Sequence, residues 1–206
     1  MDRTIVAALI CGLMVAATAG RAGDPAGSGN AAQPDYAGLF TRLEQADAVV
    51  EGARPAKSLL YVLFDANCYY CQLTWKALQA YETAGLQVHW VPVAFQQASS
   101  VGRAAAIMQA ANRGAALREN ETGYKVAQFD GGIRPLDKTP AELAARFEAN
   151  TRLMRSFGAP GTPVLVWKDG GGRVHTRIGM PRLSELPEIT RLPLQPNADP
   201  ELAKYR

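Results

Sequence analysis

Four apolar segments along the chain have the pattern of β-strands. The segment 59–64 (LLYVLF) is apolar throughout, which is typical of a strand buried on both faces. The segment 86–93 alternates and is rich in valine and tryptophan, which favours a second strand. The segments 164–167 and 173–178 flank the sequence DGGG at 169–172, which predicts a hairpin turn between two further strands.

Between these segments, apolar residues recur at helical spacing. This spacing predicts a helix over 35–52, closed by a glycine, and another helix directly after a pair of cysteines. An alanine-rich segment at 99–118 and a segment that starts at Pro140 predict further helices. A short helix is expected in 181–190, and the proline-containing tail at 191–206 is expected to be irregular.

The N-terminal segment 1–22 has the pattern of a secretory signal peptide. Arg3 precedes an apolar stretch at 5–17 that is too short to span a membrane, and small residues follow it. An uncleaved anchor is the alternative to cleavage. Residues 23–34 are small and rich in glycine and proline, which predicts a flexible linker. We therefore expect an exported protein, in an oxidising compartment such as a bacterial periplasm.

Composition limits the range of functions. The chain has 206 residues, enough for one domain with an appendage, and 48% of them are apolar. The net charge is +3 with both signs mixed along the chain, so nucleic acid is not an expected partner.

The cysteine pattern indicates thiol–disulfide chemistry. Cys11 lies within the predicted signal, so the exported chain would hold only Cys68 and Cys71, as Cys-Tyr-Tyr-Cys directly after the strand 59–64. Cysteines three apart on a helix lie on one face and can form a disulfide. Backbone N–H groups and the helix dipole at the helix start stabilise a thiolate on Cys68, and Cys71 can then attack a mixed disulfide formed there.

Metal and haem binding by the Cys68–Cys71 pair agree less well with the sequence. A structural zinc site needs four ligands, and no second cysteine pair or Cys/His cluster exists. A c-type haem needs a histidine after the second cysteine, where the chain has Gln72. Two thiolates do suit Cu(I), so a redox-inactive copper carrier or a thioredoxin-fold chaperone stays an alternative from another class. No metal or other cofactor is expected.

The order of elements predicts an α/β, thioredoxin-like fold at 53–190, with a helical insertion at about 97–157 between the second and third strands. Thr162 and Pro163 open the third strand, where that fold carries a cis-proline facing the active-site cysteines. The tolerance of proline for a cis bond allows the preceding residue to face an extended substrate chain.

The chain resembles the DsbC/DsbG family of periplasmic thiol:disulfide interchange proteins, and the DsbG branch most closely. The resemblance runs from about Leu39 to Ile189. It rests on the following segments: Val50-Glu51-Gly52, Tyr61-Val62, Asp65, Cys-x-Tyr-Cys at 68–71, Val91-Pro92-Val93, Ala104-Ala105-Ala106-Ile107 and Phe157-Gly158-Ala159-Pro160-Gly161-Thr162-Pro163.

The motifs and the resemblance together assign the candidate site. Cys68 is expected to be the nucleophile and Cys71 the resolving thiol. Thr162 and Pro163 are expected to lie against the substrate chain. Tyr69 and Tyr70 are expected to tune access to the cysteines, with plain exposed aromatics as the alternative. Asp65 is a candidate proton relay, or else a cap of the helix near Asn67.

The resemblance implies an isomerase or reductase that acts on exported proteins with cysteines and receives electrons from a membrane reductase of the DsbD type. Two departures from the family bear on this, and the first favours the alternative of a DsbA-like thiol oxidase. The family's N-terminal dimerisation domain is not recognisable, which predicts a monomer open to an oxidising partner. The second departure is Tyr69, which replaces the glycine or proline usual in the family; it changes access to Cys68 and can shift the redox potential in either direction.

Overall fold

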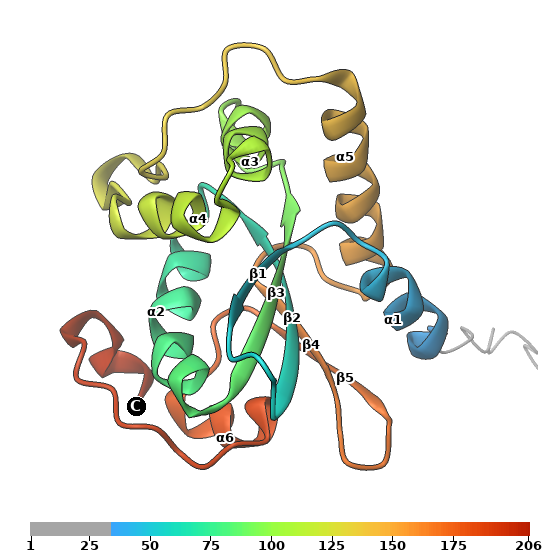
Figure 1. Cartoon of the computed structure of the whole chain (residues 1–206), viewed down its shortest axis with the longest axis vertical. Helices are drawn as coiled ribbons and strands as arrows, with labels where there is room; N and C mark the ends of the chain where they lie inside the picture. Colours follow the sequence, from blue (N-terminus) through green and yellow to red (C-terminus); the bar gives the residue numbers. More distant parts are fainter. Residues whose placement is uncertain (1–33) are drawn as a thin grey trace, which may run out of the picture. The chain divides into compact units, whose positions relative to one another are not determined.

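The computed structural model describes residues 34–206, so the predicted signal peptide and nearly all of the predicted linker lie outside the described residues. A five-stranded mixed sheet forms the centre, with strand order β1-β3-β2-β4-β5 (Figure 1). Its strands are β1 Val49–Gly52, β2 Ser58–Asp65, β3 Leu86–Val93, β4 Val164–Lys168 and β5 Val174–Ile178. The pair β2 and β3 is parallel, and the other neighbouring pairs are antiparallel.

Helices cover both faces of this sheet (Figure 1). They are α1 Tyr36–Glu44, α2 Tyr69–Ala84, α3 Ser100–Gln109, α4 Arg113–Thr122, α5 Ala141–Ser156 and α6 Leu186–Thr190. Short 3-10 helices occur at Val126–Gln128, Leu183–Glu185 and Pro200–Tyr205. Successive side chains of a strand point to opposite faces, so β2 contributes to two cores. Leu60 and Val62 pack with α2 and α6, whereas Tyr61 and Leu63 pack with α1 and α5.

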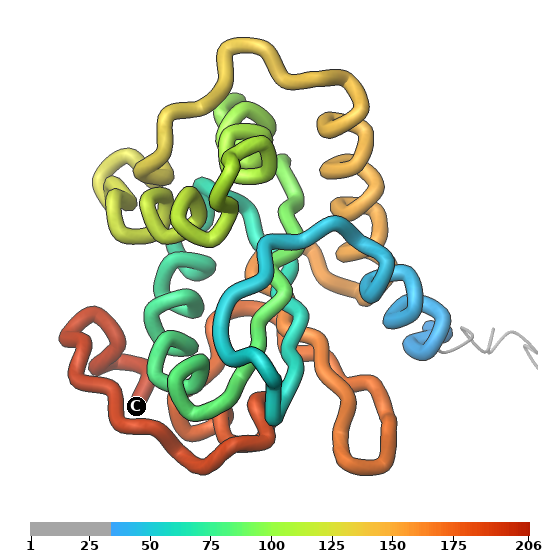
Figure 2. The backbone as a smooth tube through the Cα atoms, viewed as in Figure 1, coloured from blue at the N-terminus to red at the C-terminus, as the bar shows by residue number. Residues whose placement is uncertain are grey.

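The chain leaves the sheet after β3 and runs through α3, α4 and α5 before it returns at β4 (Figure 2). These three helices occupy the place predicted for the insertion. The alanine-rich segment does not form one helix, because the chain turns extended at Ala110 and a new helix starts after Asn112. The Asn112 side chain accepts a hydrogen bond from the Ala115 N–H at 3.0 Å, which caps α4.

The prediction of one helix over 35–52 is wrong in its second half. Helix α1 ends at Glu44, and Val49–Gly52 forms the edge strand β1, which pairs with β3. Val49 and Val50 are β-branched and favour a strand, and pairing with β3 satisfies their backbone while Val49 becomes fully buried. Helical spacing of apolar residues could not reveal this available sheet edge.

The C-terminal tail is partly ordered. The tail predicted to be irregular contains the 3-10 helix Pro200–Tyr205, and Leu202 within it is completely buried. Among residues 34–206, no helix has both the length and the apolar character that a bilayer crossing needs.

Adjacent leucines on β2 offer a matched test of the core. Leu60 is fully buried, whereas Leu59 is 38% exposed. We expect Leu60→Ala to lower the free energy of unfolding by about 2–5 kcal/mol, because it removes apolar contacts and leaves a cavity. Leu59→Ala should cost well under half as much. Urea unfolding followed by circular dichroism measures both values, and equal losses would contradict the described orientation of β2.

Candidate active site

The two cysteines lie at the start of α2, directly after the central strand β2. Cys68 is the N-cap residue of α2, and its own N–H donates to the Asp65 carbonyl oxygen at 2.9 Å. Cys71 lies one turn into the helix, on the same side. Both are free thiols, and each is only 1% exposed. The structure therefore brings the pair together in the arrangement that the sequence predicted.

Hydrogen bonds make the two thiols unequal. The Cys71 backbone N–H donates to Cys68 Sγ at 3.3 Å. The pKa of Cys68 is lowered to about 7, mainly by the hydrogen bond from the Cys71 side chain, with further donors at Thr162 and Gln96 and with burial acting in the opposite direction. Burial and the neighbouring Cys68 raise the pKa of Cys71 well above its usual value. Near neutral pH the first sulfur is therefore readily a thiolate, while the second keeps its proton.

The Thr162-Pro163 segment lies directly against Cys68. The thiol of Cys68 donates to the Thr162 carbonyl oxygen at 3.4 Å, and the Thr162–Pro163 peptide bond is cis. Thr162 is 8% exposed and precedes β4. The fold thus joins two motifs that are far apart in the sequence.

The two tyrosines between the cysteines differ in their surroundings. Tyr70 is 50% exposed, so its ring is available at the surface beside the pair. Tyr69 is partly buried, with its ring centroid 6.1 Å from that of Tyr124 and 5.8 Å from the ammonium of Lys204. Their roles in access to Cys68 stay predictions.

Asp65 lies at the site as a completely buried acceptor. Its Oδ1 accepts from the Asn67 N–H at 2.9 Å and from the Ser100 hydroxyl at 2.8 Å. Its Oδ2 accepts from the N–H groups of Phe95 at 2.8 Å and Gln96 at 3.0 Å. The carboxylate thus holds together the loops after β2 and β3. Its role as a proton relay stays a prediction.

Sequence reasoning missed several residues that surround the pair. Asn67 donates through Nδ2 to the hydroxyls of Ser99 and Ser100, at 3.0 and 3.1 Å, and accepts from the Gly131 N–H at 3.0 Å. The Tyr124 hydroxyl donates to the Asn67 carbonyl oxygen at 2.8 Å. No local motif marks these residues, because their partners come from separate parts of the insertion.

Glu121 on α4 is a second missed residue. It is 2% exposed, and burial raises its pKa well above the usual value, with the charge of Cys68 adding to the rise. Its Oε1 accepts from the Asn120 side chain at 3.1 Å. The polar stretch around Glu121 is typical of a solvent-exposed helix face, so no sequence pattern indicates its burial.

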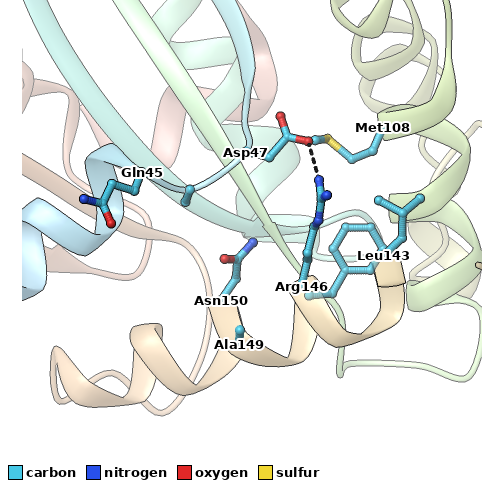
Figure 3. A pocket seen from close by; sticks show the side chains of 9 residues that line it. Gln45, Asp47, Met108, Leu143, Arg146, Ala149 and Asn150 are labelled. Carbon is cyan, nitrogen blue, oxygen red and sulfur yellow. Dashed lines mark hydrogen bonds and ion pairs between the residues drawn. The ribbon is translucent and has the colours of Figure 1, made fainter. Parts of the chain in front are cut away.

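A cavity of about 250 Å³ lies elsewhere, between the α1–β1 connection and α5 (Figure 3). Asp47 in its wall binds Arg146 at 3.5 Å and also Arg113 at 2.6 Å. None of the candidate site residues lines this cavity. Within residues 34–206, no group of three or more His, Cys, Asp or Glu side chains is placed to hold a metal ion.

The lowered pKa of Cys68 can be tested by alkylation of the reduced protein. The rate of reaction with iodoacetamide should rise with pH around a midpoint near 7, because only the thiolate reacts. Cys71→Ala should move this midpoint upward, because it removes the largest stabilising hydrogen bond. Mass spectrometry of the labelled peptide gives both profiles, and a midpoint in Cys71→Ala equal to the wild-type value would contradict this assignment.

The chain is similar to two curated proteins, both named thiol:disulfide interchange protein DsbG. It is 28% identical to the protein of Pseudomonas aeruginosa over 73% of this chain, and 24% identical to that of Escherichia coli over 69% of this chain. The matches cover 58% and 56% of those relatives, so the chain spans less than three fifths of their length. No protein-family model matches the chain.

Solved structures share the fold. A periplasmic thioredoxin-like protein from Salmonella enterica serovar Typhimurium superposes with a TM-score of 0.58 at 22% identity, over 74% of this chain and 94% of that one. Proteus mirabilis ScsC in a compact conformation gives 0.57 at 21% identity, over 82% and 80% of the two chains. The mixed sheet with its helices is the thioredoxin-like α/β architecture. The chain therefore has a thioredoxin-like fold with a Cys-x-x-Cys pair, and its sequence is similar to those of two thiol:disulfide interchange proteins named DsbG.

Proposed function

We propose that this protein is a periplasmic thiol:disulfide oxidoreductase that works as an isomerase or reductase on exported proteins. The observation that carries the proposal is the unequal pair at the start of α2. Cys68 has a pKa of about 7 and lies against Thr162, whereas Cys71 is held as a thiol. The similarity to two thiol:disulfide interchange proteins supports the same chemistry.

The first step is attack by the Cys68 thiolate on one sulfur of a substrate disulfide. A bond forms between Cys68 and that sulfur, and the other substrate sulfur leaves as a thiolate. A thiolate with a pKa near the ambient pH is well suited to this attack, because it is abundant and still nucleophilic.

The mixed disulfide can then be released in two ways. Cys71, after losing its proton, attacks the Cys68 sulfur; the substrate leaves reduced, and Cys68 and Cys71 become a disulfide. Alternatively, another substrate thiolate attacks the substrate sulfur and Cys68 leaves as a thiolate, which completes an isomerisation. Electrons pass only between sulfur atoms in both routes, so the proposed reaction uses no cofactor.

The surroundings of Cys68 suit an extended protein substrate. We assign Thr162 and Pro163 to the surface against which the substrate chain lies, because Thr162 touches Cys68. The ring of Tyr70, two residues after Cys68, is exposed and offers apolar area near the nucleophile. A membrane reductase of the DsbD type would return the Cys68–Cys71 disulfide to dithiol by the same exchange.

A thiol oxidase is the rival within this class. Stabilisation of the Cys68 thiolate favours the reduced form of the pair, and a pair with a stabilised reduced form is a stronger oxidant. In that role a substrate thiolate would attack the Cys68–Cys71 disulfide at Cys68, and Cys71 would leave.

Substitution of each cysteine tests the exchange chemistry. Cys68→Ser should abolish reduction of insulin by dithiothreitol above the uncatalysed rate, because the nucleophile is lost. Cys71→Ser keeps the nucleophile but removes the resolving thiol, so it should accumulate mixed disulfides with exported proteins. Non-reducing gels of cell extracts detect these adducts. Full turnover by Cys68→Ser would end the proposal of an exchange enzyme.

The redox state in the cell separates the two directions. We expect Cys68 and Cys71 to be mostly reduced after acid quenching and mass tagging of thiols, and to become oxidised when the DsbD-type reductase is deleted. A pair that is mostly oxidised in wild-type cells would favour the oxidase over the isomerase or reductase.

A further inference from the structure

The side chain of Gln96 lies beside the reacting sulfur, although no sequence motif marks it. Gln96 follows β3, and its Nε2 donates to the Thr162 Oγ1 at 2.9 Å. The backbone oxygen of the same Thr162 accepts from the Cys68 thiol. A third segment of the chain therefore reaches the site through Thr162.

The backbone of Gln96 is held in place by the buried carboxylate of Asp65. Its N–H donates to Asp65 Oδ2 at 3.0 Å, and the neighbouring Phe95 N–H donates to the same oxygen at 2.8 Å. The other oxygen of this buried carboxylate accepts from the N–H of Asn67, the residue before Cys68. One carboxylate therefore fixes the position of Gln96 relative to that of Cys68.

The hydrogen bond from Gln96 determines what the Thr162 hydroxyl can do. A hydroxyl has one proton to donate and can also accept. Because the Gln96 amide donates to Thr162 Oγ1, the hydroxyl proton remains available for a sulfur atom. The hydroxyl side chain of Thr162 does lower the pKa of Cys68 and of Cys71, and the Gln96 side chain also lowers the pKa of Cys68.

We propose that Gln96 is a positioning residue of the exchange site: by donating to Thr162 Oγ1 it holds Thr162 against Cys68 and leaves the hydroxyl proton free for the sulfur. This inference rests on the proposed thiol:disulfide exchange for its role in turnover. Gln96 is exposed at the surface, so this arrangement lies on a side of the site that solvent reaches.

The same donor acts when Cys68 attacks and when it leaves. During isomerisation, a substrate thiolate attacks the substrate sulfur of the mixed disulfide and a substrate disulfide forms. The electron pair of the broken bond stays on Cys68 as a thiolate, so no further oxidant or reductant is needed. A donor that stabilises this thiolate speeds its departure, because a leaving thiol of lower pKa leaves faster.

The adjacent residue provides a matched control. The Gln97 side chain turns away and donates to the backbone oxygen of Phe129 and, at 3.5 Å, to that of Gln128. We expect Gln96→Ala to raise the midpoint of the Cys68 alkylation profile by up to about one pH unit, because the Thr162 hydroxyl would no longer be held as a donor and a hydrogen bond to a charged group is worth about that much. Gln97→Ala should leave the midpoint at the wild-type value.

Gln96→Glu tests the direction of the hydrogen bond. A carboxylate would accept the hydroxyl proton of Thr162 and add a negative charge, so the midpoint should rise more than in Gln96→Ala. Equilibration with glutathione gives a second readout. Both Gln96 variants should hold more of the pair as disulfide at a given glutathione ratio, by up to about tenfold in the equilibrium constant for a shift of one pH unit.

A double-mutant cycle tests the route through Thr162. In a Thr162→Val background, Gln96→Ala should shift the midpoint much less than it does in the wild type. An undiminished shift in that background would overturn the positioning role, as would equal profiles for Gln96→Ala and Gln97→Ala. The alkylation profiles need only the reduced thiols. A wild-type protein that fails in the insulin assay would therefore refute the proposed function without altering the profiles.

Discussion

The arrangement of the site depends on one completely buried carboxylate, Asp65 at the end of β2. A buried charged group is tolerated when its oxygens accept hydrogen bonds, and Asp65 accepts four. The donors come from Asn67 before the nucleophile, from Phe95 and Gln96 after β3, and from Ser100 at the start of α3. If these segments followed another course, the buried carboxylate would lose hydrogen-bond donors. The four hydrogen bonds to Asp65 therefore fix the loops on which Cys68 and Gln96 lie.

The insertion completes this support and is part of the site. The Asn120 side chain donates to the Ala66 carbonyl oxygen at 2.9 Å, and the Gly131 N–H donates to Asn67. A Cβ atom at Gly131 would lie 2.2 Å from Asn120 Oδ1 and 2.4 Å from the Ala66 oxygen, so only glycine allows this approach. The loop between β2 and Cys68 is thus enclosed by the insertion on one side and by the sheet on the other.

The sequence was sufficient for features that depend on neighbouring residues. The apolar run 59–64, the Cys-x-x-Cys pair and Thr-Pro before a strand predicted the central strand, the start of α2 and the two halves of the site. It was insufficient where distant partners decide the outcome. Val49–Gly52 became a strand because β3 offered an edge. Gln96 is positioned by two hydrogen bonds, from its backbone N–H to Asp65 and from its side-chain amide to Thr162. Neither contact corresponds to a recognisable sequence pattern.

Glu121 shows how burial can keep charges from accumulating near Cys68. Its folded-state pKa lies well above the usual value, so the carboxyl keeps its proton at pH values where an unfolded chain would lose it. Folding therefore loses stability as the pH rises from the ordinary glutamate value towards the raised one. An ionised Glu121 would raise the pKa of Cys68, since like charges disfavour each other at short range. The depressed pKa of the nucleophile therefore depends on donors at the sulfur, and a buried acid that keeps its proton adds no opposing charge beside it.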